Sequence, residues 1–457
     1  MAYTDNVHLM DTALFKGLTC TPAMREVYNE RAQLQSWMDA EAALAKAHAE
    51  LGMIPNEAAE AIVAKADADL IDVQMVIEHG KKTAHTLMGL LTEYRKNLPE
   101  EYQTYLHSGA TTQDIIDSGT MLLAKKAHAV IESQLVALLK VAAELMKKHR
   151  DTVMVARSHG NHGLPFTFGL KMAGWVDELG RHLERWRELK KRCMVGNMSG
   201  AIGTYAAWGD KGLEVQELSC KYMGLGTPNT WWHSQRDRLA ELTYGLSLIG
   251  GTCARIAQEV YISSMTEIGE LAEGYTKGIV GSSTMPHKIN PIVSEWVVSL
   301  SRIVRGNADV MAELMAPLNE RDGRSWRAEW VVIPEAFGMA SAMLAHMHKV
   351  ISNLQVNEDR MMENVNRLKG VLCSEKAMFV LSKGMPLAEA HHVVHEVSLD
   401  ALAQDRPLAD MLMENETVAN ICTREEIEAA LKPENYLGQS GPVVDLVYEY
   451  AGKLTQD

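Results

Sequence analysis

Proline placement is the feature of this sequence that most restricts its fold. The chain has 13 prolines, but none lies in the stretches 100–164, 166–227 and 229–285. A proline inside a helix removes a backbone hydrogen bond and clashes with the preceding turn, so helix interiors exclude it. These stretches can therefore hold very long helices. Aromatic residues make up only 6% of the chain, which also favours helix over sheet.

Apolar residues in and beyond these stretches recur at three- and four-residue spacing, which is typical of amphipathic helices. Their apolar faces are broad, and several such helices bury those faces best against one another. We therefore predict a bundle of five long helices: Thr112–Arg150, Pro165–Arg192, Arg236–Gly269, Ile292–Met315 and about Trp330–Asn353.

Shorter helices are predicted on both sides of this bundle. Arg25–Leu51, Asn56–Lys65 and Asp72–Lys96 precede it, and short helices separated by Gly- and Pro-containing turns follow from about Asn357. A chain of 457 residues exceeds the size of a single simple core. The sequence therefore predicts an all-α fold with an N-terminal domain at 1–106, a central long-helix bundle at 107–355 and a C-terminal domain at 356–457.

Composition narrows the classes of function. The formal charge of −14 and the pI near 5.7 argue against a nucleic-acid binder, which usually presents a basic face. The six cysteines are far apart and form no CxxC pair, as expected of reduced thiols. We find no signal peptide and no apolar run of about 18 residues. We therefore expect a cytoplasmic protein that binds neither nucleic acid nor membrane.

Three polar segments interrupt the helical pattern: HSGATTQDIID at His107–Asp117, ARSHGNHGLPFTFG at Ala156–Gly169 and GSSTMPHKINPIVSE at Gly281–Glu295. Helix capping explains part of them, because Thr111 or Thr112 can cap the helix that follows and Pro165 can open another. Capping does not explain the histidines His107, His159 and His162, or the charged and amide groups beside the serine pair. These segments are therefore candidates for chemistry.

The third segment suits a loop that closes over a substrate and excludes water. In that interpretation Ser282 or Ser283 is the base or nucleophile. Lys288 and Asn290 hold an anion that gains charge in the transition state, and Glu295 orients a histidine. The residues alone do not say which histidine meets which serine.

The run GSSTMPHKINP resembles the G-S-S-x-M-P-x-K-x-N-P signature of the fumarase/aspartase superfamily, which is long and specific. The resemblance extends over nearly the whole chain, with matches at HSGATTQDIIDSG, ARSHGNHGLPFTFG, SGAIGTYA, WHSQRDRLAEL and NERDGRSWRAEWVVIPEA. Within that superfamily the sequence is most similar to the branch of adenylosuccinate lyase and 3-carboxy-cis,cis-muconate cycloisomerase.

The resemblance implies a three-domain, all-α subunit and a homotetramer whose central helices form a twenty-helix core. It implies active sites that take their three regions from three different subunits. It also implies an elimination from a small dicarboxylate, without a cofactor or a metal. A base removes a proton beside a carboxylate, an aci-carboxylate carbanion forms, and a C–N or C–O bond then breaks, commonly releasing fumarate.

The resemblance also implies roles for individual residues. Ser282 would be the catalytic base, His159 the general acid or leaving-group ligand, and Glu295 its partner. The other matching positions would bind substrate: Thr111, Thr112, Ser158, Gln235, Arg236, Ser283, Met285, Lys288, Asn290 and Arg321. A serine base needs nearby donors and positive charge to stabilise its alkoxide, and Lys288 and Asn290 on the same loop supply them.

The sequence departs from the motifs of both enzymes of this branch, and these departures bear on which reaction it catalyses. His85 in KTAHT matches a histidine of adenylosuccinate lyases. The phosphate-binding Ser of those enzymes corresponds to Trp326 or Arg327 of this chain, and their phosphate-binding Arg corresponds to Trp330. Indole serves a phosphate poorly, although Arg324 and Arg327 could compensate. We therefore predict that His85 and His159 serve a lyase that eliminates an amine from an N-substituted aspartate or related dicarboxylate. The alternatives are 3-carboxy-cis,cis-muconate cycloisomerase and then adenylosuccinate lyase.

A different class is also considered, namely a superfamily fold recruited as a structural or storage protein. The intact Ser282, His159 and Lys288 argue against it. His391, His392 and His395 have helical spacing, but with no third ligand evident in the sequence we predict a structural or surface role for them.

Overall fold

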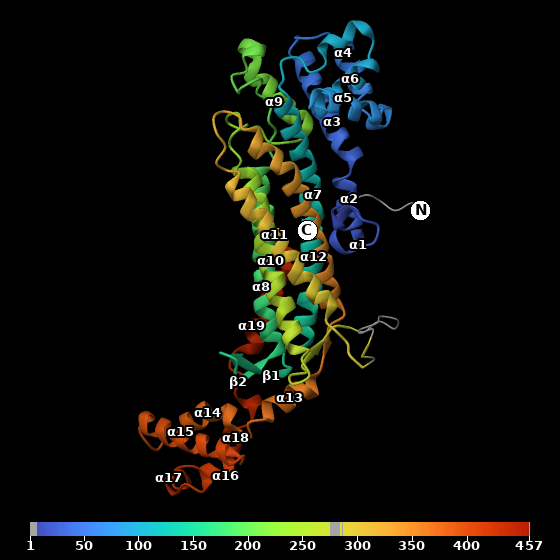
Figure 1. Cartoon of the computed structure of the whole chain (residues 1–457). Coiled ribbons are helices and arrows are strands. Elements are labelled where there is room, and N and C mark those ends of the chain that lie inside the picture. Colours follow the sequence, from blue (N-terminus) through green and yellow to red (C-terminus); the bar gives the residue numbers. More distant parts are fainter. Residues whose placement is uncertain (1–6, 275–283, 286, 457) are drawn as a thin grey trace. The chain divides into compact units, whose positions relative to one another are not determined.

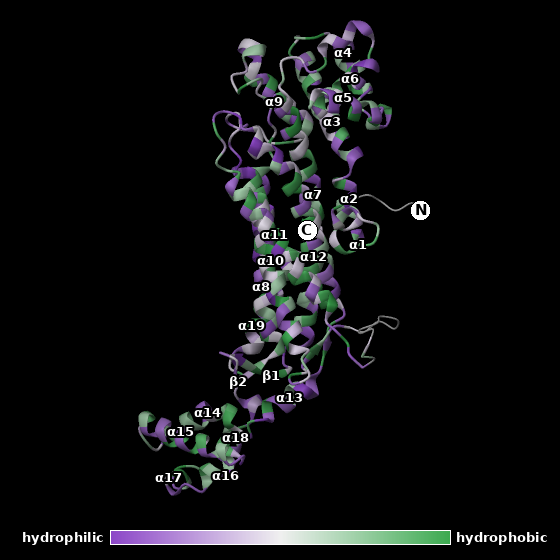
Figure 2. Cartoon of the chain, viewed as in Figure 1, coloured by the Kyte–Doolittle hydropathy of each residue, from purple (hydrophilic) through white to green (hydrophobic). Residues whose placement is uncertain are grey.

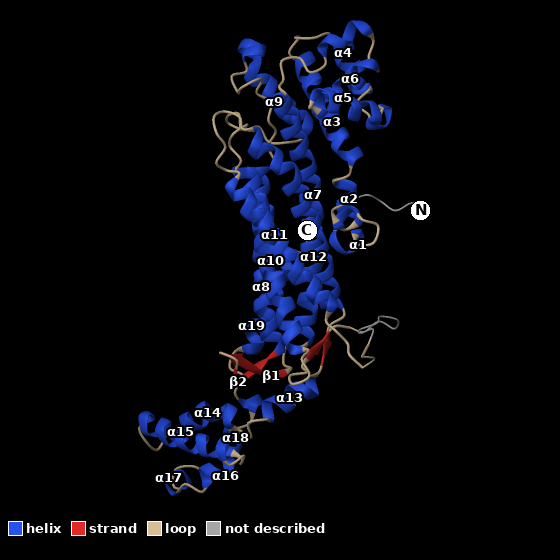
Figure 3. Ribbon diagram, in the orientation of Figure 1, coloured by secondary structure: helices blue, strands red, loops and turns tan. Residues whose placement is uncertain are grey.

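The structure is a computed structural model that describes residues 7–274, 284–285 and 287–456. Helices dominate these residues, and their strands form two antiparallel two-stranded sheets (Figure 3). The all-α prediction is confirmed. Ser282, Ser283 and Gly281 of the predicted closing loop lie outside the described residues.

The helices and strands are labelled in Figure 1 where there is room. The α-helices are α1 Lys16–Thr19, α2 Pro22–Val27, α3 Glu30–Glu50, α4 Asn56–Ala64, α5 Val73–Thr83, α6 Thr86–Lys96, α7 Thr112–Lys148, α8 Phe168–Cys193, α9 Gly212–Met223, α10 Asp237–Ser263, α11 Ile292–Glu313, α12 Gly323–Ser352, α13 Glu358–Asn366, α14 Ser374–Leu381, α15 Leu387–Ala403, α16 Leu408–Met413, α17 Glu416–Ala419, α18 Arg424–Ala430 and α19 Ser440–Leu454. The 3₁₀-helices are Leu9–Asp11, Ala68–Leu70, Glu100–Tyr105, Ala206–Lys211, Val371–Cys373 and Pro433–Asn435, and the strands are β1 Val153–Ser158, β2 Asn161–Thr167, β3 Leu271–Ala272 and β4 Gln355–Val356.

The five predicted long helices are present as α7, α8, α10, α11 and α12. Three of their ends differ from the prediction by more than two residues. Helix α10 stops at Ser263, and α8 starts only at Phe168. Helix α12 starts seven residues early at Gly323, because the Asp322 carboxylate accepts hydrogen bonds from the backbone N–H groups of Leu318 and Arg324, each at 3.0 Å.

The prediction that Pro165 opens a helix is wrong. Pro165 lies in β2, opposite Val155 of β1, in an antiparallel hairpin. Proline lacks the backbone N–H that a central strand needs to bond to both of its neighbours. A two-stranded sheet has only edge strands, where proline is tolerated. The next helix begins after Thr167, whose hydroxyl accepts a hydrogen bond from the Leu170 N–H at 3.1 Å.

Two predicted N-terminal helices are each broken in the structure. Arg25–Leu51 divides into α2 and α3, because the Asn29 side chain caps α3 by accepting from the Ala32 N–H at 2.8 Å. Asp72–Lys96 divides into α5 and α6 at Ala84, which has a left-handed backbone with φ of 54°. That turn folds α6 back against α5. His85 therefore lies at a helix junction, as the residue before α6.

The chain divides into two compact units, each described here by itself. The first contains Met1–Leu135, His182–Gly251 and Ser299–Ala345, and the second contains Val136–Arg181, Thr252–Val298 and His346–Asp457. The three-domain division stays a prediction.

The first unit has a core in which α7 and α8 are joined by a reciprocal contact. His128 stacks on Trp186 with ring centroids 4.8 Å apart. The Trp186 indole N–H donates to the His128 carbonyl at 3.0 Å, and a ring nitrogen of His128 lies 2.6 Å from the Trp186 carbonyl. Both side chains are almost fully buried, so these bonds satisfy polar groups that would otherwise be costly in an apolar core.

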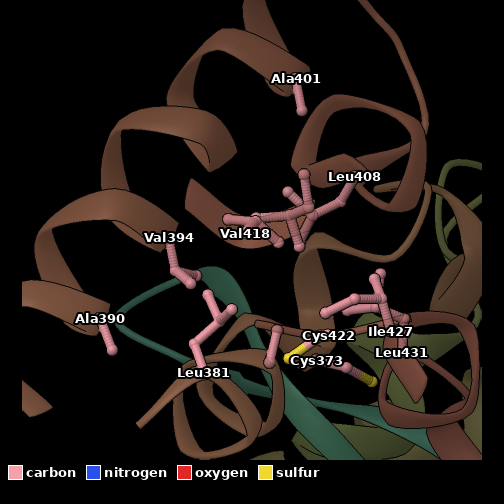
Figure 4. Packing of buried hydrophobic residues seen from close by; sticks show 12 residues of the cluster. Cys373, Leu381, Ala390, Val394, Ala401, Leu408, Val418, Cys422, Ile427 and Leu431 are labelled. Atoms are coloured by element: carbon pink, nitrogen blue, oxygen red, sulfur yellow. The ribbon is translucent and has the colours of Figure 1, made fainter. Parts of the chain in front are cut away.

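The second unit contains a separate apolar cluster in its C-terminal helices, shown in Figure 4. Leu381, Val394, Leu408 and Ile427 project into it from α14, α15, α16 and α18. Each is less than one-tenth exposed, which is the burial that stabilises a small helical domain. All six cysteines are unpaired and buried, so the expectation of no disulfide frame is confirmed.

Hydrophobic and hydrophilic residues alternate along the long helices (Figure 2), as expected of amphipathic core helices. Among the described helices, α12 is long and apolar enough to span a membrane by those two criteria. However, 67% of its most apolar window is buried inside the protein. That burial is typical of a core helix.

Gly119 allows α3 to lie close to α7. A Cβ at Gly119 would stand 2.6 Å from Trp37 Cδ1 and 2.9 Å from Ser36 Oγ. We expect Gly119→Ala to lower the free energy of unfolding by about 1–3 kcal/mol through overpacking. Gly452→Ala in α19 is the matched control, because nothing lies within 4 Å of its added Cβ. Thermal or urea unfolding measures both, and a Gly119→Ala variant as stable as wild type would contradict the close approach.

Candidate functional site

The first turn of α7 carries a fully buried carboxylate, that of Asp114. It accepts hydrogen bonds from the backbone N–H groups of Thr111, Ser199 and Gly200 at 3.1, 3.0 and 2.8 Å. A ring nitrogen of His233 lies 2.9 Å from it. One side chain in the first polar segment thus bonds to Thr111 of that segment and to two segments that are distant in sequence, the loop after Asn197 and the loop before α10.

Asp117, one turn further along α7, is the centre of a second buried cluster. Its carboxylate accepts from Arg236 Nη1 and Nη2 at 3.0 and 3.1 Å, and from Trp326 Nε1 at 2.9 Å. Arg236 also donates through Nε to Glu329 at 2.7 Å. Burial alone would lower the pKa of Arg236, but the two carboxylates outweigh burial and raise it. Arg236 therefore stays charged.

Arg236 is predicted from the resemblance to contact substrate, and its surroundings favour a different role. It is 3% exposed, and its guanidinium is engaged by Asp117 and Glu329. A guanidinium held in this way positions its neighbours, and releasing it would leave two buried carboxylates without their counter-charge. Gln235, its neighbour, is exposed and remains free of that constraint.

Arg321 lies beside the first polar segment. Its Nη2 donates to Thr111 Oγ1 and to the Ala201 carbonyl, both at 2.9 Å. Thr111 and Thr112 are half-buried, as is Arg321. A cation and hydroxyl groups at the edge of a fixed backbone loop are suited to a carboxylate ligand. Arg324 instead pairs with Asp322 at 2.7 Å.

His85 and His107 form a second group in the same unit. A ring nitrogen of His107 lies 2.6 Å from the buried carboxylate of Glu41. Burial acts to lower the pKa of His107, but the charge and hydrogen bond of Glu41 raise it overall. The pKa of His85 is lowered, first by burial and then by the positive charges of His107 and Arg327. His85 is therefore neutral at neutral pH, whereas the pKa of the neighbouring His107 is shifted in the opposite direction by Glu41.

In the second unit, His159 lies at the tip of the β1–β2 hairpin. Ser158 pairs with Asn161, so His159 and Gly160 form a two-residue turn. Both have positive φ, 51° and 81°, as a type I′ hairpin turn requires. Histidine rarely adopts this conformation, which costs about 1–2 kcal/mol. The turn presents an exposed imidazole.

The base of this hairpin is anchored by a buried ion pair. Arg157 donates to both oxygens of Glu270, at 2.6 and 2.8 Å, and Asn364 donates to the same carboxylate at 2.8 Å. Glu270 is fully buried, so the paired geometry restricts the orientation of the hairpin. The pKa of His162 is lowered by burial and by Arg157.

The described part of the third segment leads into α11. The N–H groups of Val293 and Ser294, the second and third residues of α11, donate to the Glu273 carboxylate, which caps the helix. Lys288, Met285 and Glu295 are exposed, and Asn290 is half-buried. The candidate bases Ser282 and Ser283 lie outside the described residues.

The described candidate residues divide between the two units, and among them the structure joins Arg321 to Thr111. The first unit holds His85, Thr111, Thr112, Gln235, Arg236, Arg321, Arg324 and Arg327, and the second holds Ser158, His159, Met285, Lys288, Asn290 and Glu295. Sequence reasoning missed Glu41, Asp117 and Glu329 as partners. The signal available for them was an acidic residue inside an otherwise apolar helix face.

We expect Asp114→Asn to lower the free energy of unfolding by about 2–4 kcal/mol, because its amide would face backbone N–H groups that need an acceptor. Asp177→Asn, on an exposed helix surface, is the control and should change stability by less than about 0.5 kcal/mol. Denaturant unfolding measures both. Equal stability of the two variants would contradict the role given to Asp114.

Comparison with protein families matches residues 18–306 to the family described as "Lyase" and residues 370–447 to "Adenylosuccinate lyase C-terminus". The N-acetyl-S-(2-succino)cysteine lyase of Enterococcus italicus is 39% identical, over 96% of this chain and 96% of that protein. The adenylosuccinate lyase of Pyrococcus abyssi is also 39% identical, over 94% and 96%.

A solved structure agrees with these relatives. The 3-carboxy-cis,cis-muconate lactonizing enzyme from Pseudomonas putida matches with a TM-score of 0.90 at 31% identity, covering 97% of this chain and 99% of that one. Fold, family match and sequence identity over almost the full length all agree. The chain is therefore a lyase of the fumarase/aspartase superfamily, similar to the adenylosuccinate lyases and the carboxymuconate cycloisomerases.

Proposed function

We propose that this lyase releases fumarate from a succinate that carries a heteroatom-linked group at C2. The observation that carries the proposal is the 39% identity, over nearly the full length, to relatives named for an S-(2-succino) compound and for adenylosuccinate. Both names describe a succinyl group joined to a leaving group through one heteroatom. The shared chemistry is elimination across the C2–C3 bond.

In the proposed reaction Ser282, as alkoxide, removes a proton from C3 of the succinyl group. The electron pair moves into the adjacent carboxylate as an aci-carboxylate. It then forms the C2–C3 double bond as the bond to the heteroatom breaks. The leaving group departs with the electron pair of the broken C2–heteroatom bond and takes a proton from His159, which Glu295 orients. Fumarate and the protonated leaving group are the products.

Charge on the succinyl carboxylates needs cations and donors that do not have to reorganise during the reaction. Arg321 with Thr111 and Thr112 supplies one such group, and its backbone is fixed through Asp114. Lys288 and Asn290 are proposed to supply the other. Ser158, Gln235, Ser283 and Met285 are proposed to line the site.

His85 is proposed to contact the leaving group. Its lowered pKa keeps the imidazole neutral at neutral pH, so it can give or accept a hydrogen bond without adding a positive charge. Arg324 and Arg327 follow on the first turn of α12 and are proposed to lie on the same side of the site.

The sequence predicts an amine as the leaving group, from an N-substituted aspartate. A sulfur link is the second candidate, and the name of the relative from Enterococcus italicus favours it. The position of Trp326 and Trp330 argues against adenylosuccinate, because neither indole can pair with a phosphate. The cycloisomerase reaction remains the alternative favoured by the structural match.

The proposal includes the assembly and setting of the enzyme. We infer a homotetramer whose active sites take the three polar segments from three different subunits, as the resemblance to the superfamily implies. We also infer a cytoplasmic enzyme that uses no cofactor and binds neither nucleic acid nor membrane.

A substrate panel tests the reaction. Absorbance at about 240 nm follows fumarate, while the purified protein is given an S-(2-succino) thioether, N-substituted aspartates, adenylosuccinate and carboxymuconate. We expect fumarate from an S- or N-linked succinate. The kcat/KM for adenylosuccinate should be at least about 100-fold lower than for the best of these substrates. Lactonisation of carboxymuconate with no fumarate from any succinate would overturn the proposal.

Two variants test the assigned groups on whichever substrate is turned over. Ser282→Ala should lower kcat by about 100-fold or more. His159→Asn should lower it similarly while keeping or raising the melting temperature, since asparagine accepts the left-handed turn better than histidine. Turnover unchanged in Ser282→Ala would exclude it as the base, and a folded, active His159→Asn would exclude the imidazole.

A further inference from the structure

A cavity of about 240 Å³ lies in the first unit, among α3, α7, α12 and the residue that ends α2. No histidine or lysine predicted from the loop motifs lines it, and its walls are mixed polar and apolar. It is lined by Tyr28, Gln33, Trp37, Ile116, Asp117, Thr120, Leu123, Trp326, Glu329, Trp330, Ile333 and Pro334.

The cavity contains two hydrogen-bond donors that have no partner among the described residues. These are the Tyr28 hydroxyl and the Trp37 indole N–H, whose polar atoms are both buried. Burial raises the pKa of Tyr28, so its hydroxyl keeps its proton. Trp37 is 8% exposed. Buried donors are almost always satisfied in folded proteins, so two orphans lining one cavity indicate an acceptor that arrives with a ligand.

The charges around the cavity favour a neutral hydrogen-bond acceptor over an anionic one. None of the residues lining it is Lys, Arg or His. Its two carboxylates, Asp117 and Glu329, share the single guanidinium of Arg236, which leaves an excess of negative charge. A phosphate or carboxylate would meet that excess without a counter-ion. A neutral acceptor such as an amide carbonyl avoids the repulsion and still satisfies a donor.

The side chains that line the cavity indicate that the group attached to that acceptor is small. Trp326 and Trp330 meet edge to face, with ring centroids 5.0 Å apart, and Ile116, Leu123 and Ile333 supply aliphatic surface. The volume is below the range of about 300–1,000 Å³ that is usual for drug-sized ligands. A small apolar substituent fits these walls, whereas a purine nucleotide does not.

The cavity is connected to the proposed carboxylate-binding group through α7 and through the segment that leads into α12. Ile116 follows Thr112 by four residues in α7, which is about 6 Å along the helix axis. Trp326 follows Arg321 by five residues and donates its N–H to Asp117. Asp117 therefore belongs both to the cavity wall and to the buried cluster that holds Arg236.

We propose that this cavity is the leaving-group subsite and that it takes a small neutral acylamino group, with Tyr28 and Trp37 donating to its carbonyl. The inference rests on the proposed function, because it names the part of that substrate that lies beyond the heteroatom. It makes Tyr28 and Trp37 specificity-determining residues.

The test compares two substrates, N-acetyl-S-(2-succino)cysteine and S-(2-succino)cysteine, which lacks the acetyl group and carries an ammonium group in place of the amide. Wild type should prefer the acetylated compound. Tyr28→Phe, which keeps the ring and removes the hydroxyl, should lower its kcat/KM by about 10-fold and change the other by less than about 2-fold. Tyr222→Phe, whose hydroxyl contacts Glu50 outside the cavity, is the matched control.

Trp37→Phe tests the second donor, and the melting temperature of each variant is measured beside its kinetics. A folded variant that loses the preference for the acetylated compound supports the subsite. The subsite would be overturned if the variants lost kcat/KM equally on both substrates. It would also be overturned if neither variant lost kcat/KM on either substrate.

A binding measurement separates this inference from the proposed function. Calorimetric titration with N-acetylcysteine should give binding that weakens about 10-fold in Tyr28→Phe, whether or not any succinate is turned over. If that result is obtained without fumarate release from any substrate, the proposed reaction fails and the subsite stands. Binding that is absent, or equal in wild type and variant, would overturn the subsite even in an active lyase.

Discussion

The buried carboxylates of Asp114 and Asp117 are the constraint on which the first unit depends. Both lie one turn apart on α7 and are almost completely removed from water. Such groups are stable only when donors or cations compensate for the lost hydration. The compensation comes from other segments: backbone N–H groups of two loops, His233, and Arg236 shared with Glu329. Folding therefore has to bring these segments to one place.

That requirement explains how a helical scaffold can present a precise site. The segment ending at Thr111 is held by Asp114, and Arg321 is bonded to the same threonine. In the second unit, the pair of Arg157 and Glu270 anchors the hairpin whose tip carries His159. The candidate catalytic and binding groups thus lie on short irregular segments. Buried carboxylates hold these segments through hydrogen bonds or an ion pair, which limits the reorganisation needed during catalysis.

Helix type and approximate extent could be predicted from sequence, because proline exclusion and apolar periodicity are local signals. The hairpin around His159 and Gly160 could not, since its turn depends on positive backbone angles that histidine seldom adopts. The hydrogen-bond and ion-pair partners of the buried residues could not be predicted either. Glu41 is 66 residues from His107, and Glu329 is 93 from Arg236, so no spacing rule joins them. Motif resemblance selected Arg236 as a ligand without showing that its guanidinium is already paired.

The most direct test of this account is an experimental structure of the protein with fumarate bound. The account predicts a fumarate carboxylate within hydrogen-bond distance of Arg321 and Thr111. It also predicts that Arg236 remains paired with Asp117 and Glu329. Fumarate bonded to Arg236, with the pair to Asp117 broken, would contradict the claim that the buried carboxylates build the site and that Arg236 only positions it.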